Sequence, residues 1–204
     1  MAKIKLTKNE QKKQKDSLKR FRRYLPTLLL KKQQLLIEIR LIEQRQRTLA
    51  ERRESLKRDF RRWIAVFSES EAAYDPNGKP LLAIESVRTE SGNIAGVEIP
   101  VFKGATFRFM PYDLFSTPLW IDSALERLST MMLLDLEIKV MDDQAQRLRS
   151  ELRVTTQRVN LFEKVKIPEA IENIRKIGIY LGDQQTAQVV RGKIAKKNLE
   201  RASS

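Results

Sequence analysis

The stretch that decides the fold runs from Leu18 to Phe67 and reads LKRFRRYLPTLLLKKQQLLIEIRLIEQRQRTLAERRESLKRDFRRWIAVF. Apolar side chains recur along it at alternating spacings of three and four residues, interrupted by the polar Lys32, Gln46 and Arg53. This spacing is the heptad period of a left-handed coiled coil, in which polar entries lower stability but can fix the register. With one proline and no glycine, the stretch predicts a single helix about 75 Å long.

A second stretch, from Met131 to Phe162, repeats the same alternation. Its pattern blurs around Pro168 and resumes with an offset at Ile171, Ile174 and Leu181, which predicts a break or stutter in the coiled coil. A helix as long as the first needs a partner of similar length, so we expect the two stretches to pair. The predicted seam consists of Leu28, Leu35, Ile39, Ile42, Leu49, Leu56, Ile138, Met141, Leu148, Leu152 and Val159.

Between the helices the composition changes. Residues 81–89 and 94–102 are rich in Val and Ile, and the segment Glu90–Asn93 between them is predicted to be a turn, so this region indicates a β-hairpin. Pro100 has no N–H to donate and therefore favours an edge strand. Breakers flank the hairpin at Pro76, Asn77, Gly78, Pro80, Gly104, Pro111 and Pro118. Asp122 is a candidate N-cap for the last helix.

The predicted fold class is mainly α: a long antiparallel two-helix left-handed coiled coil with a small β-hairpin insert in the middle of the chain. Residues 1–70 and 122–204 form the coiled-coil helices and residues 71–121 the insert, all in one structural unit. If the chain folds back near residue 67, the two residue numbers of each facing pair on the antiparallel helices add up to about 194, with an uncertainty of about one heptad. That register would place Pro26 opposite Pro168, and we expect both helices to kink there.

Composition excludes several classes of chemistry. The chain of 204 residues has no Cys and no His, which rules out thiolate and His-based catalysis and zinc sites of the usual kind. No phosphate-binding loop occurs either, so no catalytic site, cofactor or metal is expected. Asp135 and the pair Asp142–Asp143 are interpreted as part of a solvated face, and Trp63 and Trp120 as anchors that pack the insert.

Charge is concentrated in the first third of the chain. Residues 1–67 carry 21 Lys and Arg against 7 Asp and Glu, which accounts for the whole net charge of +14. Such a segment favours an acidic surface: nucleic acid, anionic lipid or an acidic protein cavity. The longest uncharged run, residues 114–121, is too short to span a membrane as a helix.

Several motifs, in order, resemble a known family. Ile4-Lys5-Leu6-Thr7-Lys8-Asn9 precedes Leu25-Pro26-Thr27-Leu28, and Arg158-Val159-Asn160-Leu161-Phe162-Glu163 precedes Ile167-Pro168. Together they resemble the D subunit of the V-type (V/A-type) ATPases and ATP synthases over nearly the whole chain. The resemblance implies a non-catalytic central rotor shaft that transmits torque between ATP turnover in a catalytic head and ion translocation in a membrane ring.

The resemblance also implies partners and a location. The partners are a ring of catalytic A and B subunits, the small F subunit, and a socket protein (the d or C subunit) above the membrane ring, with the chain peripheral on the cytoplasmic side. The hairpin insert is implied to stimulate ATP hydrolysis. Candidate residues for contact with the head are Lys13, Arg20, Arg23, Lys31, Arg158, Asn160 and Arg191. A basic coiled coil that binds nucleic acid, or a scaffold, remains the alternative at this point.

Overall fold

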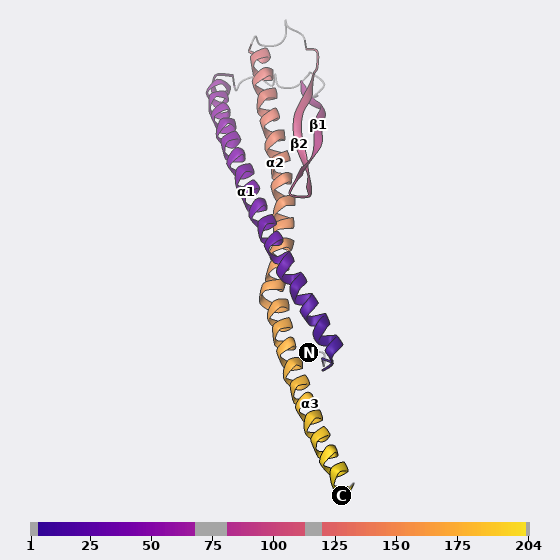
Figure 1. Cartoon of the computed structure of the whole chain (residues 1–204). Helices are drawn as coiled ribbons and strands as arrows, with labels where there is room; N and C mark the ends of the chain where they lie inside the picture. The colour runs from indigo at the N-terminus through magenta and orange to yellow at the C-terminus, as the bar shows by residue number, and fades with distance from the viewer. Residues whose placement is uncertain (1–3, 68–80, 113–119, 203–204) are drawn as a thin grey trace. The chain divides into compact units, whose positions relative to one another are not determined.

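The computed structural model describes residues 4–67, 81–112 and 120–202 (Figure 1). The elements, in chain order, are α1 (Lys8–Phe67), β1 (Leu82–Ile94), β2 (Val97–Phe109), α2 (Ile121–Leu161), a π-helical turn η1 (Phe162–Lys166) and α3 (Ile167–Ala202). The predicted fold class, mainly α with a two-stranded insert in the middle of the chain, is confirmed. The breakers Pro76, Asn77, Gly78, Pro80 and Pro118 lie outside the described residues, as does the side chain of Trp63.

The chain divides into two compact units. One, which we name the hairpin unit, contains residues 33–153. The other, the terminal unit, contains residues 1–32 and 154–204. Helices α1 and α2 each contribute one segment to each of the two units.

In the hairpin unit, α1 and α2 pair in antiparallel fashion. Arg149 on α2 bonds Glu43 on α1 at 2.6 Å, and rising residue numbers on α1 then meet falling ones on α2. Gln46 donates to Asp142 at 3.5 Å, and Arg53 donates to Asp135 at 3.4 Å. The residue numbers of each pair sum to 188 or 192. These sums differ from the expected value of about 194 by less than the seven residues of one heptad.

The β-hairpin differs from its prediction in the position of its turn. Its two strands are longer than expected, and the loop between them contains only Ala95 and Gly96, since Ile94 pairs with Val97. Both loop residues have positive φ, 52° and 79°, which is typical of the tight type I′ turn. Asn93 accepts a bond from the backbone N–H of Gly96 at 3.0 Å and fixes this turn. The predicted turn at residues 90–93 is therefore wrong, because these residues pair within the ladder.

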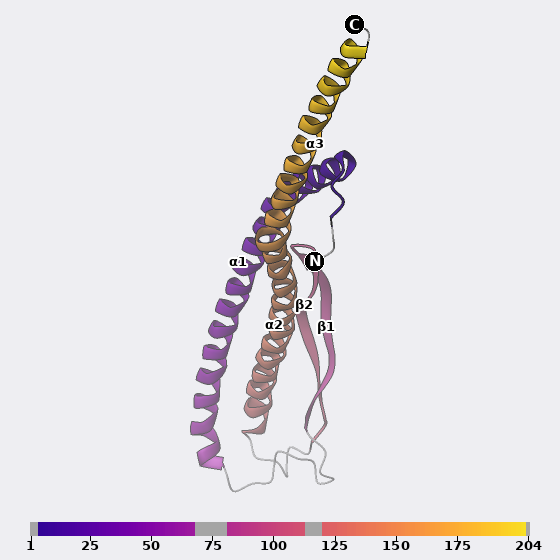
Figure 2. The same ribbon diagram turned by 90° about the horizontal axis from the view of Figure 1, so that it is seen from below.

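Two apolar clusters hold the hairpin unit together. At the tip of the hairpin, Ile99 packs with buried residues of α1 and α2, namely Leu35, Ile39, Ile42, Ala145 and Leu148. At its base, Leu81 and Leu82 pack with Ile121 and Leu125 of α2, and Trp120 contacts this second cluster. Figures 1 and 2 both show the two strands lying along α2. Trp120 thus anchors the insert as predicted.

The start of α2 corrects another expectation. Asp122 was the expected N-cap, but the helix already includes Ile121, so Asp122 lies in the first turn. There it accepts a hydrogen bond from the hydroxyl of Tyr112. A carboxylate in the first turn is favoured by the helix dipole, which explains why this residue type occurs so close to the expected position.

The N-terminus of α1 follows the capping rules. Thr7 accepts a bond from the backbone N–H of Glu10 at 3.3 Å, the geometry of an N-cap. Further on, Pro26 lies inside the helix and removes one backbone donor. The hydroxyl of Thr27 donates to the carbonyl of Tyr24 at 2.8 Å beside this position.

In the terminal unit, the start of α1 lies against the region around η1. The rings of Phe21 and Phe162 are 5.2 Å apart between centroids. Side chains of Gln14, Ser17 and Phe21 line one surface hollow together with Lys166, Glu169, Ala170 and Asn173. The pairing is again antiparallel, because Gln11 approaches Gly178.

The buried stripe of this unit differs from the predicted one. Its buried members from Thr155 onward are Thr155, Val159, Ala170, Asn173 and Ile177. Ile171, expected in the stripe, is 44% exposed, and Ile174 and Leu181 are half-buried. Thr155 and Val159 belong to the predicted stripe, whereas beyond Pro168 the packed face uses Ala170, Asn173 and Ile177 instead of the predicted residues.

The predicted break near Pro168 takes the form of η1. The backbone N–H of Ile167 donates to the carbonyl of Phe162, five residues earlier, so the helix widens by one residue just before the proline. A proline in a regular helix clashes with the carbonyl four residues before it, and this wider turn relieves the clash. The flanking Lys166 and Ala170 line a hollow together with Gln14, Ser17 and Phe21, so Pro168 lies opposite a part of α1 that precedes Pro26, and the shared kink stays a prediction.

Candidate functional site

The predicted seam residues are all at least partly buried. Leu35, Ile39, Ile42, Leu148 and Val159 are buried. Leu28, Leu49, Leu56, Ile138, Met141 and Leu152 are half-buried. None of the eleven is exposed, so all can contribute to packing within their units.

Two of the three polar entries in the first stripe have partners on α2. Arg53 forms an ion pair with the half-buried Asp135, and its Nε atom is buried. The side chain of Asp135 is still 43% exposed, so Asp135 lies at the edge of the solvated face and is paired there with Arg53. Asp142 is exposed as expected, although it also accepts a bond from Gln46. Asp143 binds Arg147 of its own helix at 2.9 Å.

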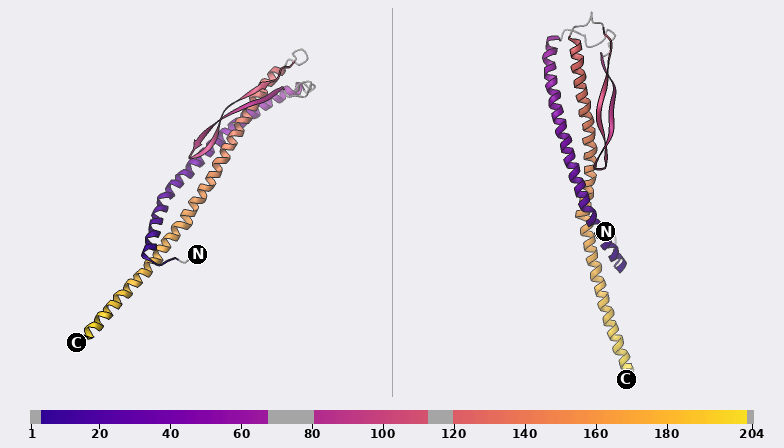
Figure 3. Two further views of the ribbon diagram at one scale, coloured as in Figure 1. Left: turned by 90° about the vertical axis from the view of Figure 1, so that its right-hand side faces the viewer. Right: turned by 45° about the horizontal axis from the view of Figure 1, so that its top comes forward.

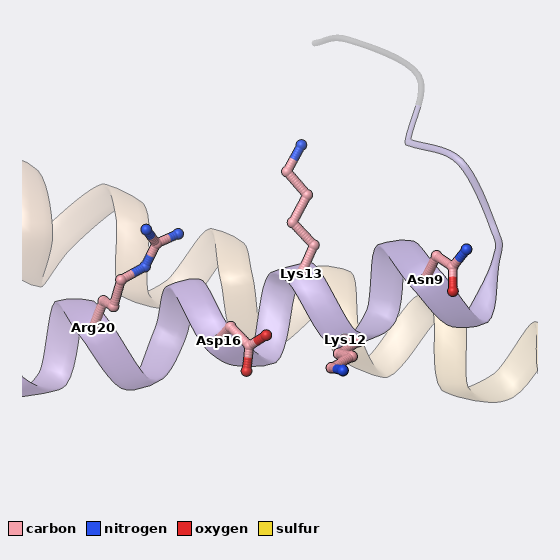
Figure 4. Close-up of a pocket in the computed structure, with 5 residues that line it drawn as sticks. All are labelled: Asn9, Lys12, Lys13, Asp16 and Arg20. Carbon is pink, nitrogen blue, oxygen red and sulfur yellow. The ribbon is translucent and has the colours of Figure 1, made fainter.

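The candidate head-contact residues all belong to the terminal unit. Lys13, Arg20, Arg23, Arg158, Asn160 and Arg191 are exposed, and Lys31 is half-buried. Figure 4 shows five residues on one segment of α1: Lys13 and Arg20 project to one side, while Lys12 and Asp16 project to the other. These side chains do not converge, so the segment presents an open basic flank rather than a closed binding site.

The C-terminal part of α3 has no helical partner among the described residues. Figure 3 shows α3 continuing well beyond the start of α1. From residue 188 to residue 199 every position is exposed. The apolar side chains on it include Val189, Val190, Ile194 and Leu199, the last of which is 71% exposed. An exposed helix with apolar and basic side chains is suited to contact with another protein.

The hairpin presents one strand to solvent and the other to α2. Gln144 donates to the carbonyl of Pro100, and Arg147 donates to the carbonyl of Glu98 at 3.5 Å. These bonds attach β2 to α2, while most of β1 is exposed. Ion pairs link the strands, with Glu85 and Arg108 at 2.7 Å and Glu90 and Lys103 at 2.9 Å.

Among the described residues, the resolved pKa shifts belong to groups in surface pairs. The bond to Asp122 raises the pKa of Tyr112 above its usual 10.0, with some desolvation adding to the effect. The bond from Arg175 lowers the pKa of Glu172. Among residues 4–67, 81–112 and 120–202, no group of three or more acidic side chains is placed to hold a metal ion. No helix in these same ranges is long and apolar enough to cross a bilayer.

Comparison with known proteins gives consistent matches over the whole chain. The family model for the D subunit of ATP synthase matches residues 10–197. The V-type ATP synthase D subunit of Borreliella burgdorferi is 50% identical over 98% of this chain and 96% of its own length. Those of Chlamydia pneumoniae and Chlamydia muridarum are 32% and 34% identical, each over 97% of this chain and over 93% and 96% of their own. The nucleic-acid alternative gains no support from these matches.

Proposed function

This chain belongs to the ATP synthase D-subunit family and is a non-catalytic stalk subunit of a V-type rotary ATPase, and from that premise we propose that it is the central rotor shaft. In this role the helix pair transmits torque between ATP hydrolysis or synthesis in a catalytic head and ion translocation in a membrane ring. The chain supplies mechanical coupling, and its partners supply the chemistry.

The observation that carries the proposal is the bridging of α1 and α2 in the hairpin unit. Side-chain bonds join the two helices at successive levels, from Glu43–Arg149 through Gln46–Asp142 to Arg53–Asp135. Torque on a helix pair tends to slide one helix along the other. Bonds and packed apolar side chains between the helices oppose that sliding, so a pair resists twisting better than a single helix.

The exposed basic surface suits a part that turns inside a bearing. Exposed ion pairs contribute about 0–1 kcal/mol each and exchange partners readily. Lys13, Arg20 and Arg23 can therefore face acidic groups of successive surrounding subunits without holding the shaft at one angle. An asymmetric shaft that contacts each surrounding site differently favours a different state in each, which is a population shift by differential contact.

The rotor proposal also specifies the partners of the chain. The terminal unit, with the candidate head-contact residues, would lie within the ring of A and B subunits. The small F subunit and the socket protein, the d or C subunit, would bind elsewhere along the chain. The chain would then be a peripheral part of the complex on the cytoplasmic side of the membrane.

Cross-linking in the intact complex tests the proposal. Because the chain has no Cys, Arg20→Cys introduces a single thiol on this subunit at an exposed position. A cleavable thiol-to-amine cross-linker should join it to a head subunit, stop ATP hydrolysis, and release the block when the linker is cut. The control is the same variant capped with N-ethylmaleimide before the cross-linker is added, which should keep its activity. Full hydrolysis in complexes cross-linked to the head would contradict rotation of this chain.

A further inference from the structure

The apolar seam of the hairpin unit does not by itself specify how α1 and α2 are aligned. Heptad positions repeat every seven residues, so sliding one helix by seven residues again places apolar side chains opposite apolar ones. Such a slip shifts the helices by about 10 Å. Something other than the apolar stripe has to select one alignment.

The polar pairs differ from the apolar seam in this respect. Arg53 binds Asp135, and Gln46 binds Asp142. The two members on each helix are seven residues apart, so both pairs report one alignment, with residue numbers summing to 188. Arg53 is also the more deeply placed partner, since its Nε atom is buried against the carboxylate of Asp135.

We infer that the Arg53–Asp135 pair is a register lock that holds α1 and α2 in a single alignment. The lock acts mainly by excluding the wrong alignments. Each side chain is still about a third or more exposed, at 34% and 43%, so the attraction alone is modest. The large effect is the cost of placing a charge against an apolar partner.

The two neighbouring alignments show this cost. If α2 slides so that Asp142 faces Arg53, then Asp135 faces Phe60. If it slides the other way, Arg53 faces Leu128 and Asp142 faces Ile39. Both slips also separate Arg149 from Glu43, which bond at 2.6 Å in the observed alignment. The first slip is the less costly one, because Arg53 keeps an acidic partner on α2 in addition to Glu54 of its own helix.

The hairpin does not supply this lock by hydrogen bonding. Its bonds from Gln144 and Arg147 attach it to α2, so it would move with that helix. A slip of one heptad would replace Leu35, Ile39 and Ile42 beneath its tip by Ile42, Gln46 and Leu49. Two of those three positions remain apolar, so packing at the tip penalises the slip only in part.

This reasoning gives opposite expectations for one substitution at two sites a heptad apart. Asp135→Leu removes the acidic partner of Arg53 on α2, leaving it Glu54 of its own helix, and removes the penalty of facing Phe60, so it should populate the first slipped alignment. Asp142→Leu leaves Arg53 with Asp135 and removes only the longer contact to Gln46, so the single alignment should persist.

The measurement is the distance between spin labels at Thr48→Cys and Ser150→Cys, two exposed positions, in the full-length chain. In the observed alignment Thr48 faces a position near residue 140, so the labels are offset along the axis by about 15 Å. The slip reduces this offset by about 10 Å. We expect a second, shorter distance for Asp135→Leu and the parent distance alone for Asp142→Leu. One parent distance in both variants, or the same second distance in both, would overturn the inference.

If Asp135→Leu fails to fold, exchanging the charges of Arg53 and Asp135 provides a second test. Asp135→Arg alone places two guanidinium groups together and should lose the single parent distance. Arg53→Asp combined with Asp135→Arg restores the pair in reverse and, in the slipped alignment, sets the new carboxylate on α1 against Asp142. The double variant should therefore recover the parent distance, and its failure to do so would also overturn the register lock. None of these measurements depends on the proposed rotor function.

Discussion

Gly92 and Gly182 differ in the space around their Cα atoms. A Cβ added at Gly92, in β1, would lie 2.8 Å from a methyl group of Val101, closer than real contacts allow. A Cβ added at Gly182, in α3, would meet nothing within 4 Å. Gly92 is therefore required by packing, and Gly182 only lowers the helix propensity of its segment.

The same substitution should then act in opposite directions. Gly92→Ala should destabilise the chain by about 1–3 kcal/mol through overpacking. Gly182→Ala should stabilise α3 by about 0.5–1 kcal/mol, because alanine is the better helix former. Chemical denaturation of both variants beside the parent measures the difference, and equal effects would refute the contrast.

Tyr112 and Asp122 give a prediction about pH. The hydrogen bond holds the phenol in its protonated form and raises its pKa above 10.0. A group whose pKa is raised on folding stabilises the fold fully below its unfolded pKa, and this contribution is lost as pH rises through the folded pKa. Asp122→Asn should bring the pKa of Tyr112 down toward 10.0, as measured by NMR of ring-labelled tyrosine. An unchanged titration would mean that the bond does not form in solution.

Residue type and spacing predicted the buried side chains before η1 but not those after it. Leu35, Ile39 and Leu148 lie in the seam because their size and spacing both mark the inner face. Asn173 and Ala170 are also buried, yet neither is large and apolar. The one-residue widening at η1 shifts the buried face by one residue just before them, and no heptad count anticipates that shift.

At the scale of elements, the hairpin depends on one side chain near its tip. Ile99 is 4% exposed and packs with residues of both helices. Ile99→Ala should therefore cost about 2–4 kcal/mol by loss of burial and formation of a cavity. Val87, on the exposed strand of the same hairpin, is the matched control, and Val87→Ala should cost under about 0.5 kcal/mol. Thermal unfolding followed by circular dichroism compares the two, and equal melting temperatures would show that the tip does not pack in solution.

The position of this hairpin was predictable, and its turn was not. Runs of Val and Ile between Pro and Gly residues indicate two strands, whichever residues of the two strands pair with each other. The turn required recognising that Ala95 adopts positive φ beside Gly96, a conformation unusual for alanine. Gly92 is the more conspicuous glycine, but it lies inside the ladder because Val101 leaves no room for a larger side chain.

For the whole molecule, the stalk role requires α1 to be continuous. Ile39→Pro removes a backbone bond in the middle of α1 at a buried position, at a cost of about 3 kcal/mol or more. It should abolish assembly of the complex or uncouple ATP hydrolysis from ion pumping. Asn9→Pro places the same residue in the first turn of α1, where no intrahelical donor is needed, and should be tolerated. ATP-driven ion uptake by vesicles containing the complex is the measurement; coupled uptake at the parent level in Ile39→Pro would contradict the shaft role.

The π-helical turn at Phe162–Lys166 determines how this part of the chain responds to a change in its length. One α-helical residue subtends about 100°. The π-helical turn takes one residue more than an α-helical turn for nearly the same rotation, so deleting a single amino acid there would restore ordinary winding and leave the surface from Ile167 to Ala202 facing the same way. The turn thus absorbs one surplus residue, which in a regular helix would turn every side chain that follows by roughly 100°.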